Sequence, residues 1–468
     1  MEGRKLRNKI GERLSTIKAP NSFVIIFAFI LMAAVLTFVV PAGEYDRVCN
    51  DTGAEVVLAD SFHYVESAPI GPMALFVTIA EAFAGNADII FCILFAYCFV
   101  GALVESGAFH AVIQKVMNAL KNRTALLLPL VMLLFGVMGS VAGIAEETFG
   151  MFPICITLAF ALGYDRIVGG SIVYLAVFTG FAAATFNPYT VGVAQTIAGV
   201  PLYSGILYRM ICFFVFMSIL ILYVMRYAAK IKADPSKSIL FGYEEVPPQT
   251  KLDGGSGITG RQLCALLLFA LIFFFIVFGA IQWGWYINEI LALFVIGFIL
   301  MGIINRWSPN TMGDKMVTIG SGTLFSMLII GFSNTVSLVL EKGRIIDTIV
   351  HYMASWMNGS SGYLSAFLML IIQNLLNFFI PSGPGQAGVS MPIMAAFADV
   401  TGNTRQLAVL AFQFGDGFSN IFWPTMVCMM CGILKVPIGK WYRFVAPLFG
   451  IMFLAQVVLL MVAVAIGY

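Results

Sequence analysis

The sequence is short of charged residues. Asp, Glu, Lys and Arg together make up 11% of its 468 residues, whereas a soluble protein keeps about a quarter of its residues charged. The net charge of +2 provides no strongly basic surface for nucleic acid. The three histidines, His63, His110 and His351, are isolated and lack the spacing of metal ligands. These shortages argue against a soluble globular protein, a nucleic-acid partner and a histidine metal centre.

Long apolar runs fill most of the chain, and hydrophobic residues make up 60% of it. The eight cysteines are scattered, mostly in these runs, and form no disulfide framework. The basic N-terminus is followed by "FVIIFAFILMAAVLTFVV", which is too long for the core of a signal peptide. We therefore predict an all-α polytopic membrane protein. Runs of about 20 apolar residues predict nine crossings, near 22–41, 87–104, 167–199, 205–228, 262–281, 286–305, 322–340, 406–432 and 445–466.

Loop charges predict how these crossings are oriented. The segment 42–70 is rich in Asp and Glu and should lie outside, whereas the linker 229–261 is rich in Lys and should lie in the cytoplasm. The basic segment 1–21 should also be cytoplasmic. We therefore expect a multi-pass protein of the plasma membrane with its N-terminus inside and its C-terminus outside.

Two further apolar stretches, 124–163 and 363–401, are long enough for two spans but are interrupted by glycines and polar residues. The second contains "IPSGPGQAGVSMP" (380–392), whose prolines and glycines should break any helix. Basic residues flank the first stretch on both sides, so both of its ends should face the cytoplasm. We expect each stretch to form a re-entrant hairpin, and the two hairpins to enter from opposite faces.

Matching motifs in the two halves indicate an internal repeat. "LVESG" (103–107) matches "VLEKG" (339–343), and "TFNPYT" (185–190) matches "IFWPTM" (421–426), in the same order and at nearly one spacing. The first unit spans 22–228 and the second 286–468, and an extra crossing at 262–285 inverts the second. Paired broken segments in inverted halves are typical of the midplane site of a secondary transporter.

The chain resembles the YfcC family of the ion-transporter superfamily. The similarity lies in "VPAGEYDR" (40–47), "GIAEETFGMFPI" (143–154), "NPYTVGVAQTIAGVPLYSG" (187–205), "NFFIPSGPGQAGVSMPIMA" (377–395) and "FGDGFSNIFWPT" (414–425). Relatives include arginine/ornithine exchangers, four-carbon dicarboxylate carriers and short-chain fatty-acid carriers. The resemblance implies a homodimer with a scaffold domain, a mobile transport domain and elevator-type alternating access. It leaves the substrate open.

Candidate substrate-binding residues cluster at the predicted hairpin turns and helix breaks. A carboxylate at membrane depth requires a partner, and acid is concentrated at the first turn and in "FQFGDGFSN" (412–420). Aligning Pro153 with Pro392 places Glu147 opposite Gln386. The predicted substrate-binding residues are Glu146, Glu147, Asn187, Ser382, Gly383, Gly385, Gln386, Asp416 and Asn420. The predicted hinges or helix breaks are Gly143, Pro188, Pro384, Gly388, Gly415, Gly417 and Pro424.

Because this site is acidic and no Lys or Arg is evident at membrane depth, we expect a basic amino acid as substrate. Arg209 and Arg443 are placed at span ends. The alternative is a four-carbon dicarboxylate or short-chain fatty-acid carrier coupled to Na⁺ or H⁺. "FSNT" (332–335) is similar to a sodium motif of distant relatives but falls in a crossing helix. We expect no cofactor.

Two other classes are considered. An intramembrane aspartyl protease would need glycine where Gln413 stands, so we expect no enzyme. Broken helices also build the filters of channels, and counterflow across liposomes separates a channel from a carrier.

Overall fold

The chain is helical along most of its length. The computed structural model describes residues 21–49, 55–58, 60–109, 111–112, 115, 126–143, 145–243, 258–285, 287–357 and 359–468. The predicted basic segment 1–20, His110 and much of the linker lie outside this part. The long helices are α2 (Ser22–Val39), α3 (Pro72–Gly85), α4 (Ala87–Glu105), α11 (Ile206–Ala233), α12 (Gly260–Gln282), α13 (Ile287–Ile304), α14 (Pro309–Gly320), α15 (Leu324–Lys342) and α21 (Ile438–Ala465).

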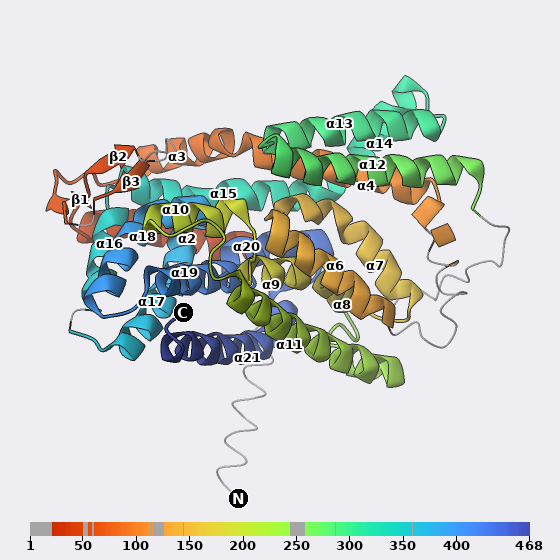
Figure 1. Ribbon diagram of the computed structural model, residues 1–468. Coiled ribbons are helices and arrows are strands. Elements are labelled where there is room, and N and C mark those ends of the chain that lie inside the picture. Colours follow the sequence, from red (N-terminus) through yellow and green to blue (C-terminus); the bar gives the residue numbers. More distant parts are fainter. Residues whose placement is uncertain are drawn as a thin grey trace, which may run out of the picture.

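Most of these helices run in roughly the same direction (Figure 1). Four short strands, β1 (Gly43–Glu44), β2 (Arg47–Cys49), β3 (Glu55–Val57) and β4 (His63–Tyr64), lie at one end of the molecule, which we call the strand end. α11 finishes and α12 begins at the other, which we call the linker end. The acidic segment 42–70 and the lysine-rich segment after α11 therefore lie at opposite ends.

Several helices are long and apolar enough to cross a bilayer. Within the described residues there are six, or eight if each of the bent pairs α14–α15 and α19–α20 makes one span. The six include α17, which the sequence predicts as a hairpin arm, but not α12 or the interrupted helix at 166–198. The chain is a multi-pass membrane protein.

The first interrupted apolar stretch forms a helical hairpin. Its arms are α6 (Leu127–Ala142) and α7 (Phe152–Ala161), joined by the 3-10 helix η2 (Glu146–Met151). α6 ends at Gly143, whose φ of 66° is left-handed and favours glycine. α6 runs parallel to α9. Gly136 of α6 lies against Gly180 of α9, and one turn later in α6 the carbonyl of Ser140 accepts from the N–H of Thr185, which follows α9. The open end of the hairpin lies toward the linker end, because Lys232 near the end of α11 lies 5.4 Å from the ring of Tyr164, just after α7.

The second interrupted stretch forms a hairpin of α17 (Gly362–Phe379) and α18 (Gly383–Val400). Its base is closed by Asn403, which donates to the carbonyl of Gly362 over 2.8 Å. The predicted long break is wrong. Only Ile380, Pro381 and Ser382 are non-helical, and α18 continues through Gly388 and Pro392. Pro384 stands in the first turn, where no N–H is needed, so it begins the helix instead of breaking it.

Each hairpin packs against an interrupted helix. The first consists of α8 (Arg166–Gly170), the π-helical turn η3 (Ser171–Leu175) and α9 (Ala176–Ala182), then a break, then η4 (Pro188–Gly192) and α10 (Val193–Ala198). The second consists of α19 (Arg405–Ser419), a break at 420–423 and α20 (Pro424–Leu434). Pro188 and Pro424 each open the helix that follows a break, as the sequence predicts.

The two interrupted helices cross one another closely. Gln413 donates to the carbonyl of Phe181 over 2.6 Å, and the hydroxyl of Tyr174 donates to the carbonyl of Asn420 over 2.6 Å. Gly415 and Gly417 were predicted as helix breaks, but both lie inside α19. Their role is packing, since a Cβ at Gly417 would collide with the backbone of α9 and one at Gly415 with that of α17.

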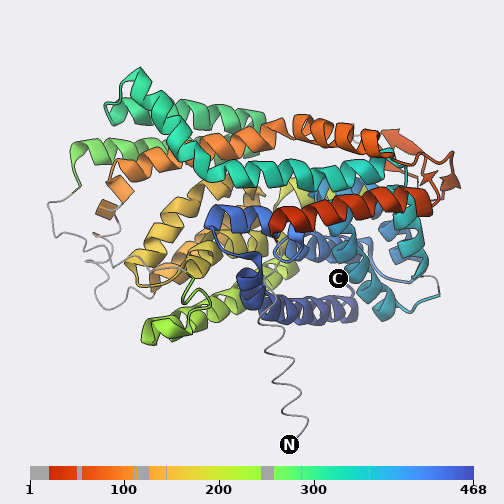
Figure 2. The same ribbon diagram turned by 180° about the vertical axis from the view of Figure 1, so that it is seen from behind.

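The features that were not predicted include α3, α14 and the strands. α2 lies beside α15 when the molecule is seen from behind (Figure 2).

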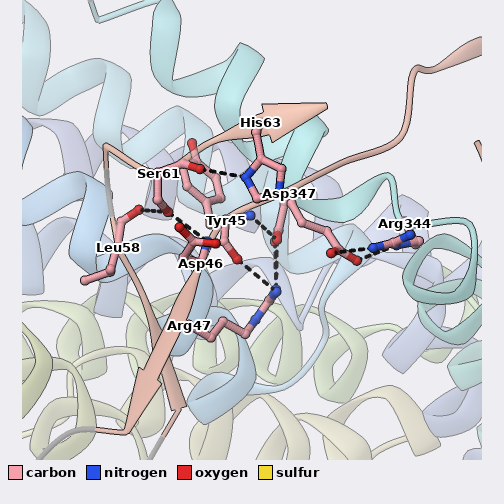
Figure 3. Close-up of polar contacts among 9 residues, drawn as sticks. Tyr45, Asp46, Arg47, Leu58, Ser61, His63, Arg344 and Asp347 are labelled. Carbon is pink, nitrogen blue, oxygen red and sulfur yellow. Dashed lines mark hydrogen bonds and ion pairs between the residues drawn. The ribbon is translucent and has the colours of Figure 1, made fainter. Parts of the chain in front are cut away.

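At the strand end, side chains of the strand segment bind α16 (Ile346–Ser355) and the residues before it (Figure 3). Arg47 pairs with Asp347 at 2.9 Å and Arg344 with Glu44 at 2.5 Å. Arg344 lowers the pKa of the Glu44 carboxyl.

Candidate functional site

A cavity of about 220 Å³ lies where the hairpin tips and the helix breaks meet α4 and α15. One set of lining residues comes from α4, α13, α15 and the residue before α4: Asn86, Ile89, Ile287, Ile330, Ser333 and Asn334. The other set comes from the hairpins and interrupted helices: Gly143, Ala145, Phe178, Phe181, Tyr189, Pro381, Ser382, Gly383, Pro384, Asp416, Asn420, Thr425, Met426 and Met429. The cavity therefore lies between α4, α13 and α15 on one side and the hairpins and interrupted helices on the other.

Asp416 is the charged residue of this lining. It stands in α19, one turn before the break, and is 1% exposed. Asn377 of α17 donates to its Oδ1 over 2.9 Å. A Cβ at Gly383 would lie 3.4 Å from Oδ2, so the tip of the second hairpin directly faces this carboxylate. The sequence singled out Asp416, and the fold brings it to the cavity together with Ser382, Gly383 and Asn420.

The start of α18 presents its backbone to the same cavity. Ser382 caps this helix by accepting from the N–H of Gly385 over 3.4 Å. Helix N-termini carry partial positive charge and unpaired N–H groups that favour an anionic ligand. The short side chains at the tip let a solute approach this backbone, so the cavity joins an anion-binding element to a carboxylate.

The first hairpin contributes Gly143 and Ala145. Glu146 and Glu147 follow directly in η2, but their side chains lie outside the described part of the structure. Asn187 is fully buried and its Oδ1 accepts from the N–H groups of Tyr189 and Thr190, at 2.9 and 3.3 Å. Asn187 was predicted to bind substrate, and in the structure its side chain caps the helix that follows the break.

Gln386 does not face the cavity. Its Nε2 donates to the side-chain and backbone oxygens of Gln373 on α17, at 2.7 and 2.9 Å, and it is fully buried between the hairpin arms. The substrate-binding role predicted for it is therefore not supported, because its amide nitrogen is bound to Gln373 inside the hairpin. Gly385 is likewise absent from the lining, although its N–H joins the cap at Ser382.

Sequence reasoning missed four polar residues of the lining: Asn86, Ser333, Asn334 and Thr425. Ser333 donates to the carbonyl of Thr425 over 3.2 Å and so joins α15 to α20. Ser333 and Asn334 belong to "FSNT", which the sequence flagged, and Thr425 follows a predicted break at Pro424. Asn86 is a polar residue between two apolar runs, and this position could have marked it as a candidate site residue.

Arg209 stands in the first turn of α11, at a span end, as predicted from the sequence. Its burial was not predicted: the residue is 1% exposed. Its guanidinium nitrogens make no hydrogen bond within the described part. A buried charge without hydrogen bonds is costly, and a membrane arginine is a functional candidate. Arg209 does not line the cavity at Asp416.

The site can bind a small solute but contains no sign of a metal centre. Within the described residues, no three His, Cys, Asp or Glu side chains gather in one place. The cavity combines one carboxylate, neutral amides and hydroxyls with a helix N-terminus. Such groups hold a charged metabolite by hydrogen bonds and charge, without covalent chemistry.

Comparison with known proteins decides the class. The family model for DcuC, described as "C4-dicarboxylate anaerobic carrier", matches residues 19–465. The chain belongs to this family. It is therefore a membrane transporter of the DcuC family and not an enzyme.

The relatives cover the same length. The protein "Putative basic amino acid antiporter YfcC" of Escherichia coli strain K12 is 29% identical over 491 residues, which cover 96% of this chain and 97% of that protein. An uncharacterized protein of Haemophilus influenzae is 27% identical over 502 residues, covering 97% and 99%. The DcuC family member thus resembles the YfcC protein from end to end, as the sequence motifs indicated.

Two solved structures share low similarity with this chain. The YdaH transporter of Alcanivorax borkumensis is 15% identical with a TM-score of 0.46, covering 96% of this chain and 99% of that one. MtrF of Neisseria gonorrhoeae, whose structure is described as illuminating a class of antimetabolite efflux pumps, is 16% identical with a TM-score of 0.45 and covers 95% of each chain. At these TM-scores, neither structure informs the fold or the substrate of the DcuC family member.

Proposed function

We propose that this DcuC family transporter is a secondary carrier that imports or exchanges a basic amino acid such as arginine, ornithine or lysine. The observation that carries the proposal is that Asp416 and the N-terminus of α18 lie next to each other in the lining of one small cavity. Within the described lining, Asp416 is the charged side chain and no Lys or Arg accompanies it. A basic amino acid has a carboxylate for the helix N-terminus and a cation for Asp416.

The same site fits a dicarboxylate less well. Two carboxylates would meet a third at Asp416, and like charges in a low-dielectric site repel strongly. The second candidate is nevertheless a four-carbon dicarboxylate carrier coupled to Na⁺ or H⁺. The description of the family favours it, and a helix N-terminus is a ready anion site. The relative described as a basic amino acid antiporter favours the first candidate.

For the mechanism, we propose elevator-type alternating access in an inverted repeat of nine crossings, with two re-entrant hairpins. Support comes from the position of the cavity between α4 and α15 on one side and the hairpins and interrupted helices on the other. Movement of the second group relative to the first would carry a bound solute between the strand end and the linker end.

We further propose a homodimer in the bacterial inner membrane, with the N-terminus cytoplasmic and the C-terminus outside. The lysine-rich linker end would face the cytoplasm and the acidic strand end the exterior. Labelling of single cysteines placed at Glu66 and Lys237 in intact cells tests the orientation. Exclusive labelling at Glu66 supports it, and exclusive labelling at Lys237 reverses it.

The substrate is tested by radiolabelled arginine uptake into proteoliposomes, competed with amino acids and dicarboxylates. We expect arginine, ornithine and lysine to compete and succinate and fumarate to fail. Competition by dicarboxylates alone would establish the second candidate. Counterflow would confirm a carrier over a channel, and uptake driven by a Na⁺ or an H⁺ gradient alone would identify the coupling ion. Asp416→Asn should abolish arginine uptake, whereas Asp314→Asn, the same change at an exposed residue outside the cavity, should not.

A further inference from the structure

A basic pocket lies at the linker end, between the end of α11, the start of α21 and the chain that follows α11. Five cations line it: Arg226, Lys230, Lys237, Lys440 and Arg443. Its other walls are aromatic and apolar, namely Tyr223, Tyr227, Ile239, Phe241, Phe444 and Ile451, with Ser236 and Ser238 between them. The pocket is separate from the cavity at Asp416.

Most of this positive charge is not neutralised inside the protein. Lys237 pairs with Asp234 at 3.3 Å. The other four cations have no ion pair or side-chain hydrogen bond within the described part of the chain. Several like charges around one pocket raise the local potential and favour a polyvalent anion.

Hydrogen bonds between neighbouring elements fix the shape of the pocket. Asp165, which is 3% exposed, accepts from the hydroxyls of Tyr227 and Ser238 at 2.6 and 2.7 Å. These bonds fold the chain after α11 back against α8. Tyr223 donates to the carbonyl of Phe444 over 2.8 Å and so joins α11 to α21. The walls that carry the cations are therefore held in place before any ligand arrives, and the one buried carboxylate already has its hydrogen bonds.

The pocket also adjoins the apolar outer surface of the same two helices. Leu222 of α11 is 57% exposed, and Ile451 and Leu454 of α21 are 46% and 65% exposed. In a bilayer, such surfaces contact acyl chains. Tyrosines beside them are typical of the level of the lipid headgroups. The cations would meet a phospholipid's charged headgroup, the tyrosines its glycerol region, and the exposed aliphatic side chains its acyl chains.

We propose that this pocket binds the headgroup of an anionic glycerophospholipid. Arg443 and Arg226 can each present two N–H groups to phosphate oxygens, and Lys230 and Lys440 add point charge. Tyr223 and Phe444, which line the pocket, would contact the glycerol and the first carbons of the acyl chains. Bound there, the lipid would bridge α11 and α21, the last helices of the two halves.

Native mass spectrometry of the detergent-solubilised transporter can test this. The delipidated protein would be titrated with phosphatidylglycerol, with phosphatidylcholine, and with inorganic phosphate. We expect phosphatidylglycerol to bind at least ten-fold more tightly than phosphatidylcholine, and inorganic phosphate to compete only weakly. Equal binding of the two lipids, or phosphate binding as tight as that of the lipid, would overturn the lipid site.

A charge-matched control separates the pocket from a general positive surface. The variant Lys230→Gln with Arg443→Gln removes two exposed cations from the pocket. The variant Arg261→Gln with Arg306→Gln removes two exposed cations that do not line the pocket, one in the first turn of α12 and one just after α13. Phosphatidylglycerol affinity should fall at least ten-fold in the first and less than two-fold in the second. Equal losses in the two variants would show that only net charge matters.

Discussion

Asn377 donates from Nδ2 to the Oδ1 of Asp416 over 2.9 Å, from the last turn of α17 to the last turn of α19. This bond orients the carboxylate whose other oxygen lies next to Gly383 in the cavity lining. It also fastens the second hairpin to its interrupted helix beside the cavity. Binding of a cation at Asp416 should therefore depend on Asn377, although Asn377 does not line the cavity.

We predict that Asn377→Ala raises the KM for arginine about ten-fold, as expected from losing one hydrogen bond to a charged group, worth about 1.5 kcal/mol. The maximal rate should change less, because the carboxylate remains. Concentration-dependent uptake in proteoliposomes measures both values. The control is Asn374→Ala, one turn earlier on α17, whose amide donates only to its own helix at Leu370. Equal effects of the two changes would contradict a positioning role.

The glycines at the helix crossings should tolerate no side chain. A Cβ at Gly180 would collide with the carbonyl oxygen of Gly136, and one at Gly417 with the backbone of Ala182. We predict that Gly180→Ala and Gly417→Ala each lower the melting temperature by several degrees, since overpacking of about 1–3 kcal/mol is typical. Gly450→Ala, where nothing lies within 4 Å, should leave it unchanged. Thermal unfolding in detergent provides the measurement.

Movement between the two groups of helices should be blocked by joining α15 to α20. Ser333 and Thr425 contact one another, so a disulfide between Ser333→Cys and Thr425→Cys should stop arginine uptake until it is reduced. The native cysteines would first be replaced. A pair at Glu81 and Lys342 lies within the proposed scaffold and should leave uptake intact after oxidation. Full uptake with Ser333 and Thr425 joined would refute the elevator.

Acid should loosen the strand end. Because Arg344 lowers the pKa of Glu44, this pair stabilises the folded state above the ordinary carboxyl pKa, and its contribution disappears as the pH falls through the lowered value. We predict that the melting temperature of Glu44→Gln depends less on pH in this acidic range than that of the parent. The two curves should differ most near neutral pH. Parallel curves down to the most acidic pH tested would show that the ion pair contributes nothing.

Replacing Arg209 should separate stability from transport. Its guanidinium is buried and has no hydrogen bond within the described part, so Arg209→Met should keep or raise the melting temperature. If the charge serves transport, uptake should nevertheless fall at least ten-fold, and Arg209→Lys should retain more of it. A variant that transports normally would show that this arginine is dispensable.

Much of the helical arrangement could be predicted from apolar runs and repeated motifs. The apolar runs at α2, α4, α11 and α21 are long enough to be recognised as membrane spans, and Pro188 and Pro424 mark helix starts after breaks. α3 and α14 were missed because each continues into a longer helix after a short interruption, at Asn86 and at 321–323. The strands were missed because they are two or three residues long and depend on their pairing for order.

The candidate site could be predicted only in part. Asp416 and the tip at Ser382 and Gly383 were identifiable, since an acid or a helix break inside an apolar run is unusual. The partner of Gln386 could not be read from the sequence, because Gln373 stands thirteen positions away on the other hairpin arm. The burial of Arg209 was equally hidden. Position at the end of a span does not reveal whether neighbouring helices cover a side chain.

The hydrogen bond from Tyr174 to the carbonyl of Asn420 and the one from Gln413 to the carbonyl of Phe181 each join a residue at or near one helix break to the body of the other interrupted helix. A change in geometry at either break therefore acts on the other interrupted helix. Thermodynamic linkage makes this influence reciprocal. A ligand held at one half of the protein and an ion held at the other would then change each other's affinity by the same factor, so the crossing itself can couple two cargoes without any residue that touches both.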